Sequence, residues 1–142
     1  MKTQNFQNHA RIVIGYHRVG SIGMLLLIIG SFVNLFTSSP ENLYSASLIC
    51  LMSLLLLLVA SYTRLFPLKA QDRAIRAEEN LRYYVLTGKL LPAGLRISQI
   101  IALRFASDEE FVALVDRALS ENLRSKDIKK SIKNWRADHH RV

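Results

Sequence analysis

Two long apolar runs, residues 19–37 and 43–65, lie near the start of this 142-residue chain. Each run is about as long as a helix must be to cross the hydrocarbon core of a bilayer, roughly 20 residues. No Asp, Glu, Lys or Arg interrupts either run before Arg64. The runs therefore predict two membrane-spanning helices, and the short connector between them allows only an antiparallel hairpin.

A cleaved signal peptide is the alternative for the first run, because the residues before it are basic. The apolar stretch is longer than the roughly 7–15 residues of a signal-peptide core. The residues that follow it, Phe36 to Pro40, contain no Ala-x-Ala-like cleavage site. We therefore interpret residues 19–37 as a retained transmembrane helix.

The charges that flank the two runs predict their orientation. The connector, residues 38–42, contains one acid and no base. The outer flanks of the two runs are basic: Lys2, Arg11, Arg18, Arg64, Lys69, Arg73 and Arg76. Because basic flanks stay in the cytoplasm, we expect both termini there. The chain then divides into a basic cytoplasmic N-terminal segment (1–18), a transmembrane hairpin (19–66) and a basic cytoplasmic helical domain (67–142).

The last part of the chain carries amphipathic patterns without strand alternation, so the whole chain is predicted to be all-α. After Pro67 an amphipathic helix is expected over 69–87. It is expected to end there because Gly88 is a typical C-terminal cap residue. A short helix is expected around 97–106. The apolar stripe of the first of these helices is expected to consist of Ala74, Ala77, Leu81 and Tyr84, flanked by Ile75 and Val85.

A helix-start signal stands at Ser107, with Glu110 three residues later. The pair is typical of a capping box, in which the glutamate reaches back to the backbone N–H of the serine. A last helix is expected over 126–136, with Ile128 and Trp135 on its apolar side. The domain is thus predicted to be compact and to contain about four amphipathic helices.

The stretch 71–82 is dominated by polar and charged residues and follows the second apolar run closely. One interpretation is a solvated helix with surface ion pairs, which contribute little to stability. The other is a docking face, either for the neighbouring helix or for a protein partner. The residues assigned to this predicted docking face are Asp72, Arg73, Arg76, Glu79 and Arg104.

The chain is basic mainly in its C-terminal part. From Arg64 onward it has 16 basic and 10 acidic residues, which is +6 of the total +8. Four lysines share one side of the predicted last helix: Lys126, Lys129, Lys130 and Lys133. Each basic residue near an anionic bilayer contributes about 1 kcal/mol, so this face is predicted to contact anionic lipid. Nucleic acid is not the expected partner, because no aromatic platform interleaves with the bases.

No complete catalytic or metal-binding pattern occurs in the sequence. The only cysteine, Cys50, lies inside the second apolar run, and the four histidines provide no converging set of three or four ligands. Phosphate-loop, dinucleotide and nucleophile-elbow motifs are absent. The sequence predicts neither a metal nor a cofactor. An enzyme would require a cleft with perturbed titratable groups, and a pocket that brings His17, Glu79 and Arg104 together would support that alternative.

Three stretches carry a resemblance to a known family: 69–82, 99–110 and 132–138, together with residues 8–11 and His17. With these motifs the chain resembles an uncharacterised family of small bacterial membrane proteins, filed under a domain of unknown function. The resemblance covers nearly the whole chain and implies two spans followed by a cytoplasmic helical domain in the bacterial inner membrane. It implies no activity.

These observations favour a non-enzymatic integral membrane protein that acts as an accessory or scaffold subunit. Its cytoplasmic domain would dock a membrane complex, and its partners would be membrane lipids and either another protein or a second copy of the chain. One alternative is an anionic-lipid-sensing or membrane-organising protein. The other alternative is an enzyme that acts on a membrane-associated substrate.

Overall fold

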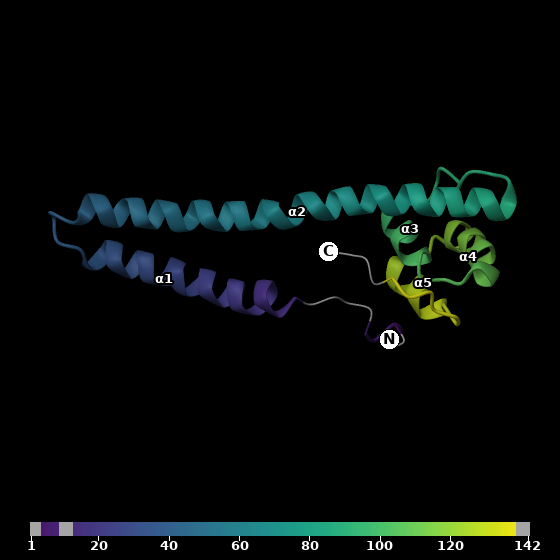
Figure 1. Ribbon diagram of the computed structural model, residues 1–142, viewed down its shortest axis with the longest axis horizontal. Coiled ribbons are helices and arrows are strands. Elements are labelled where there is room, and N and C mark those ends of the chain that lie inside the picture. The colour runs from purple at the N-terminus through teal and green to yellow at the C-terminus, as the bar shows by residue number, and fades with distance from the viewer. Residues whose placement is uncertain (1–3, 9–12, 139–142) are drawn as a thin grey trace. The chain divides into compact units, whose positions relative to one another are not determined.

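The computed structural model describes residues 4–8 and 13–138, and the described residues form helices without a strand (Figure 1). In chain order the elements are a π-helix η1 (Gly15–Gly20), α1 (Ser21–Thr37), α2 (Leu43–Thr87), α3 (Ile97–Leu103), α4 (Asp108–Ser120) and α5 (Ser125–Ser131). The prediction of an all-α fold, with two long apolar helices toward the N-terminus, is confirmed. Lys2, His9, Arg11 and the tail histidines 139 and 140 lie outside the described residues.

The chain divides into two compact units. One is Ile12–Phe66, called here the hairpin unit, and the other comprises Met1–Arg11 and Pro67–Val142, called here the helical unit. Two helical stretches, Gly15–Thr37 and Leu43–Thr87, are apolar and long enough to cross a membrane by length and composition.

In the hairpin unit, α1 and α2 contact each other through small and polar side chains. Ser31 of α1 and Ser53 of α2 are buried, and their hydroxyl oxygens lie 3.0 Å apart in a hydrogen bond. Toward the start of the unit, the Tyr16 hydroxyl donates a hydrogen bond of 2.8 Å to the backbone carbonyl of Ala60. The first bond joins α1 to α2, and the second joins η1 to α2 at a separate point.

Helix α2 continues through Pro67, so the predicted separation of a helix over 43–65 from a helix over 69–87 is wrong. A proline inside a helix removes one backbone hydrogen bond and crowds the carbonyl four residues earlier, at a cost of about 3 kcal/mol. Long helical segments flank this proline on both sides.

The face of α2 that packs on the rest of the helical unit consists of Ile75, Glu79 and Tyr83, which are all buried. The predicted apolar face is wrong, because Leu81 is 64% exposed and Tyr84 is 52% exposed. Both stripes repeat every three to four residues, so periodicity alone does not distinguish them. Because the buried stripe contains the charged residue Glu79, its sequence does not indicate an apolar face.

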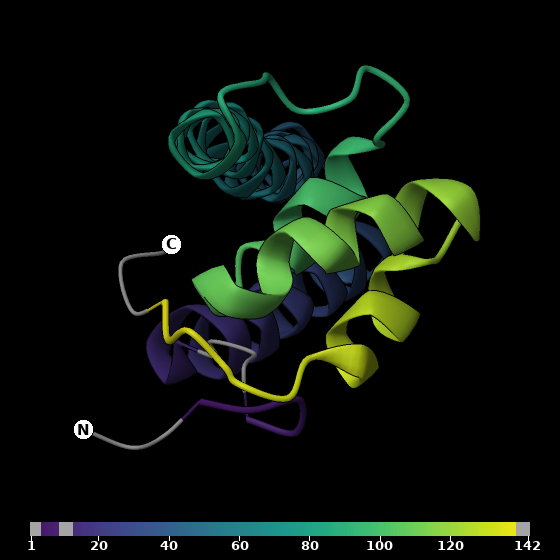
Figure 2. The same cartoon turned by 90° about the vertical axis from the view of Figure 1, so that its right-hand side faces the viewer.

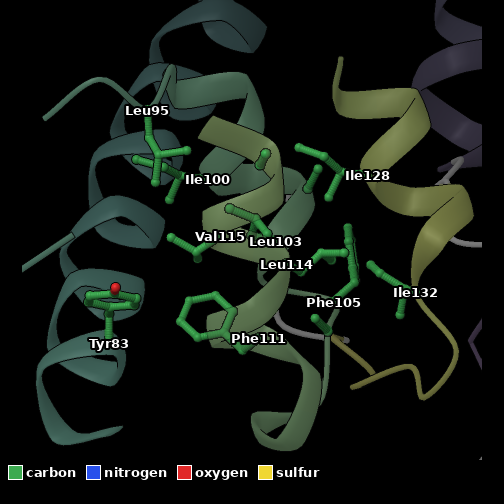
Figure 3. Close-up of a cluster of buried hydrophobic side chains, with 13 residues drawn as sticks. Tyr83, Leu95, Ile100, Leu103, Phe105, Phe111, Leu114, Val115, Ile128 and Ile132 are labelled. Atoms are coloured by element: carbon green, nitrogen blue, oxygen red, sulfur yellow. The ribbon is translucent and has the colours of Figure 1, made fainter. Parts of the chain in front are cut away.

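The core of the helical unit lies between α2, α3, α4 and α5 (Figure 3). Tyr83 from α2 meets the fully buried Phe111 of α4 edge to face, with ring centroids 6.2 Å apart. The buried core residues are Tyr83, Leu95, Ile100, Ala102, Leu103, Phe105, Ala106, Phe111, Leu114, Val115, Ala118, Ile128 and Ile132. The core thus fixes the C-terminal half of α2 to the shorter helices.

Helix α5 ends at Ser131, so the prediction of a helix over 126–136 is wrong. The next residues pair with the connection between α3 and α4 through an isolated antiparallel bridge. The backbone N–H of Arg136 donates to the carbonyl of Phe105 at 2.8 Å. The Trp135 ring lies 5.2 Å from the Phe105 ring, centroid to centroid. Pairing and ring packing therefore replace the last helical turns.

The capping box predicted between Ser107 and Glu110 does not form. Ser107 precedes α4 as its N-terminal cap residue, but its own N–H donates to the carbonyl of Asn134 at 3.0 Å. The Glu110 carboxylate accepts the backbone N–H groups of Lys133 at 3.2 Å and Asn134 at 2.9 Å. Glu110 therefore binds the C-terminal segment instead of capping its own helix.

Candidate docking surfaces

The structure divides the predicted docking face into buried and exposed residues. Glu79 is 5% exposed and Arg104 is 8% exposed, so both belong to the interior of the helical unit. Arg73 and Arg76 are exposed, and Asp72 is half-buried. Only part of the predicted face is therefore accessible to another protein.

Glu79 belongs to a polar network centred on Arg82. The Arg82 guanidinium donates to the Glu79 carboxylate at 3.0 Å, to the Asp108 carboxylate at 2.6 Å and to the Ala106 carbonyl at 2.7 Å. Burial raises the pKa of Glu79, and the hydrogen bond and charge of Arg82 oppose that rise. This network joins α2 to the start of α4.

Arg104 belongs to a second polar cluster in the same unit. Its Nε lies 3.2 Å from the Asp138 carboxylate, and its guanidinium carbon lies 4.6 Å from the centroid of the Phe105 ring. Asp138 also exchanges two hydrogen bonds with Gln4: its N–H donates to the Gln4 side chain at 2.8 Å, and its carbonyl accepts at 3.3 Å. The cluster therefore connects α3 to both chain ends.

A cavity of about 400 Å³ lies beside these two clusters. Its lining residues are Gln71, Ala74, Ile75, Glu78, Glu79, Arg104, Arg136, Ala137 and Asp138. Two of the three residues named for an enzyme, Glu79 and Arg104, line this cavity. The third, His17, belongs to the hairpin unit, where its ring nitrogen lies 3.1 Å from the carbonyl of Val13.

The exposed arginines lie beside a separate groove of about 410 Å³ between α2 and the linker that follows it. We call this the arginine groove. It is lined by Arg73, Arg76, Ala77, Asn80, Leu90, Leu91, Pro92, Ala93, Leu95 and Ile100. The Asn80 side-chain oxygen accepts the N–H of Leu91 at 2.9 Å and holds the linker against α2.

The arginine groove combines an apolar wall with positive charge. No acidic residue lines it. Among residues 4–8 and 13–138, no hydrogen bond or ion pair involves the side chain of Arg73 or Arg76. The apolar linker wall and the role of Asn80 were not predicted, because they depend on how the chain folds back after Gly88.

The predicted lipid face lies on and after α5. Its four lysines differ in exposure: Lys126, Lys130 and Lys133 are exposed, and Lys129 is half-buried. The ammonium of Lys129 lies 5.6 Å from the centroid of the Phe105 ring. Asp127, the acid within this helix, pairs with Arg124 at 3.1 Å. The exposed lysines therefore keep their positive charge at the surface.

Metal ligands do not converge in the part of the chain that the structure describes. No group of three or more His, Cys, Asp or Glu side chains able to hold a metal occurs there. The free cysteine, Cys50, is buried in the hairpin unit.

The fold and these surfaces define a class: an all-helical protein with two helices apolar enough to span a membrane and a helical unit with a basic groove. Residues 1–142 match the model of a family of unknown function, DUF6526, and the chain belongs to this family. No curated protein and no solved structure matches the chain.

Proposed function

We propose that this chain is a non-enzymatic integral membrane protein of the bacterial inner membrane that serves as an accessory or scaffold subunit. Its hairpin spans the bilayer with both termini in the cytoplasm. The helical unit then docks a membrane complex on the cytoplasmic side. The observation that carries this proposal is the arginine groove, an apolar surface with two unpaired arginines.

The membrane placement is supported by the composition of the hairpin unit. Its exposed surface is built from large apolar side chains, among them Leu25, Leu26, Leu55 and Leu58. A soluble protein rarely exposes so continuous an apolar surface. The cytoplasmic placement of the termini is supported by the basic flanks and by the acidic connector.

The chemistry of the groove indicates what it binds. Apolar residues of the linker can bury an apolar side chain, and the guanidinium groups of Arg73 and Arg76 can pair with carboxylates. We therefore assign to the groove an acidic segment of a partner protein that carries an apolar anchor residue. Because no acidic residue lines the groove, the negative charge that pairs with the two arginines must come from the bound segment.

The test is purification of the tagged full chain from native membranes in mild detergent, with the double variant Arg73→Glu/Arg76→Glu. The proposal predicts a stoichiometric protein partner with wild type and its loss with this variant, while membrane insertion is unchanged. The matched control is Lys89→Glu/Arg117→Glu, which alters the net charge equally at exposed positions outside the groove and outside the lysine face of α5. A partner that is retained by the groove variant contradicts the docking assignment.

The exposed lysines on and after α5 favour a second candidate function, the recognition of anionic lipid. Three lysines at a bilayer surface would contribute about 3 kcal/mol of attraction at low salt. The variant Lys126→Glu/Lys130→Glu/Lys133→Glu is then expected to co-purify with less anionic lipid, and the wild-type enrichment should fall as salt rises. Equal lipid content in both proteins would exclude this candidate.

A further inference from the structure

The outer side of α2 in the helical unit carries an exposed apolar stripe, called here the outer seam. Its residues are Ala70, Ala74, Ala77, Leu81 and Tyr84, and all five are exposed. The seam lies opposite the buried face of Ile75, Glu79 and Tyr83. Figure 2 shows the linker and α3 to α5 gathered on one side of this part of α2. All five seam residues remain exposed, although Ala77 also lines the arginine groove and Ala74 also lines the other cavity.

The spacing of the outer seam is that of a coiled coil. Its residues are separated by four, three, four and three positions, which is the alternation of the a and d sites in a heptad repeat. Three alanines allow two backbones to approach closely, and Leu81 and Tyr84 supply larger side chains toward the end of the helix. A second α2 helix therefore fits this seam by spacing and by size.

The charges beside the seam select the orientation of the second helix. Arg73 lies at a g site and Glu78 at the e site five residues later, and both are exposed. In a parallel coiled coil, a g residue faces the e residue five positions later in the other helix. Arg73 would then face Glu78 of the second copy, and the symmetry of the pair forms this contact twice.

An antiparallel pair lacks this match. It brings g sites to g sites and e sites to e sites. The g sites hold Arg73 and Asn80, and the e sites hold Gln71, Glu78 and Val85, so no opposite charges meet. Within the described residues neither Arg73 nor Glu78 forms an ion pair in its own chain. Both charges are therefore available to a second copy.

We infer that two copies of this chain form a parallel homodimer through the outer seam of α2. Two copies inserted in one membrane with the same topology present these helices in the parallel orientation that the charges require. This dimer is a contact between two copies of the chain and is a separate proposal from the docking of another protein in the arginine groove. Because Arg73 and Ala77 also line the arginine groove, the second copy and a partner bound in the groove would compete for Arg73.

The test is disulfide cross-linking of the full chain in native membranes, in a Cys50→Ser background. Ala70→Cys and Ala77→Cys both occupy d sites, so a parallel dimer brings each to its own counterpart. Both are expected to form covalent dimers under mild oxidation. Arg76→Cys is the control, because it is exposed but turned about 100° from Ala77. Cross-linking at only one seam position, or none above the control, would overturn the proposal.

Charge exchange provides the second measurement. Arg73→Glu and Glu78→Arg should each lower the cross-linking yield of Ala77→Cys about fivefold, because two attractive pairs become repulsive. The combined variant should restore the yield. A combined variant that stays as weak as the single variants contradicts the assigned register. Arg73 belongs to both the groove and the dimer contact, so Arg76→Glu is the variant that separates the two tests. It should weaken partner capture by the groove and leave the cross-linking yield unchanged.

Discussion

Arg82 and Asp108 form an ion pair of 2.6 Å between the C-terminal half of α2 and the first turn of α4. The Arg82 side chain is only 10% exposed. Its guanidinium carbon lies 4.2 Å from the centroid of the Phe111 ring, a cation–π distance. Arg82 therefore adds polar and aromatic contacts to the core packing that holds α2 against α4.

Replacement of this arginine is expected to destabilise the helical unit strongly. Arg82→Leu leaves the buried Glu79 carboxylate without its counter-ion, and a broken buried pair costs about 3 kcal/mol or more. The measurement is denaturant unfolding of the full chain in micelles, followed by the fluorescence of Trp135, the only tryptophan. The control, Arg117→Ala, removes an exposed pair with Glu121 and should leave the midpoint nearly unchanged. Equal midpoints for both variants would contradict the role of Arg82.

Glu110 is expected to hold the C-terminal segment in place. Glu110→Ala removes the acceptor of two backbone N–H groups and should cost about 1 kcal/mol or more. Hydrogen exchange should speed up at Lys133 and Asn134 before it changes in the core helices. Glu109→Ala is the matched control, since Glu109 is exposed on the same turn. Unchanged exchange at both amides in Glu110→Ala would show that the contact is dispensable.

The stability of the helical unit should fall with rising pH through Glu79. Because burial raises its pKa in the folded unit above the ordinary value of 4.5, the unfolded chain loses this proton at a lower pH. Glu79 therefore contributes its full stabilisation of the folded unit below pH 4.5. This stabilisation is lost as the pH rises through the pKa that Glu79 has in the folded state. Glu79→Gln should show a flatter stability profile over this range. A profile parallel to that of wild type would contradict the assignment.

The apolar runs and the all-α fold could be predicted from sequence, because length and apolar composition are local properties. The buried face of α2 could not. Glu79 is buried with Arg82 as its ion-pair partner, and Arg82 is in turn bound by Asp108 of α4, which comes from a distant part of the chain. Residues 132–136 likewise fit a helical pattern, yet Glu110 and the backbone of Phe105 bind this segment in an extended form.

The candidate site was predictable only in part, for the same reason. Arg73 and Arg76 were named from charge, and the structure exposes both beside a groove. Glu79 and Arg104 were named from charge as well, but each has ion-pair partners inside the helical unit. Charge identifies such residues, whereas their exposure depends on contacts between segments that are far apart in sequence.

The most direct test of the docking function is site-specific photo-cross-linking in living cells. A photoreactive residue replaces Ala93 in the arginine groove, and the control replaces Asp116, which is exposed on α4 outside the groove. If the groove docks a partner, one protein adduct is expected from position 93 and none from position 116, and the adduct is lost with Arg73→Glu/Arg76→Glu. No adduct from position 93, or an adduct that survives the charge reversal, would contradict the docking function.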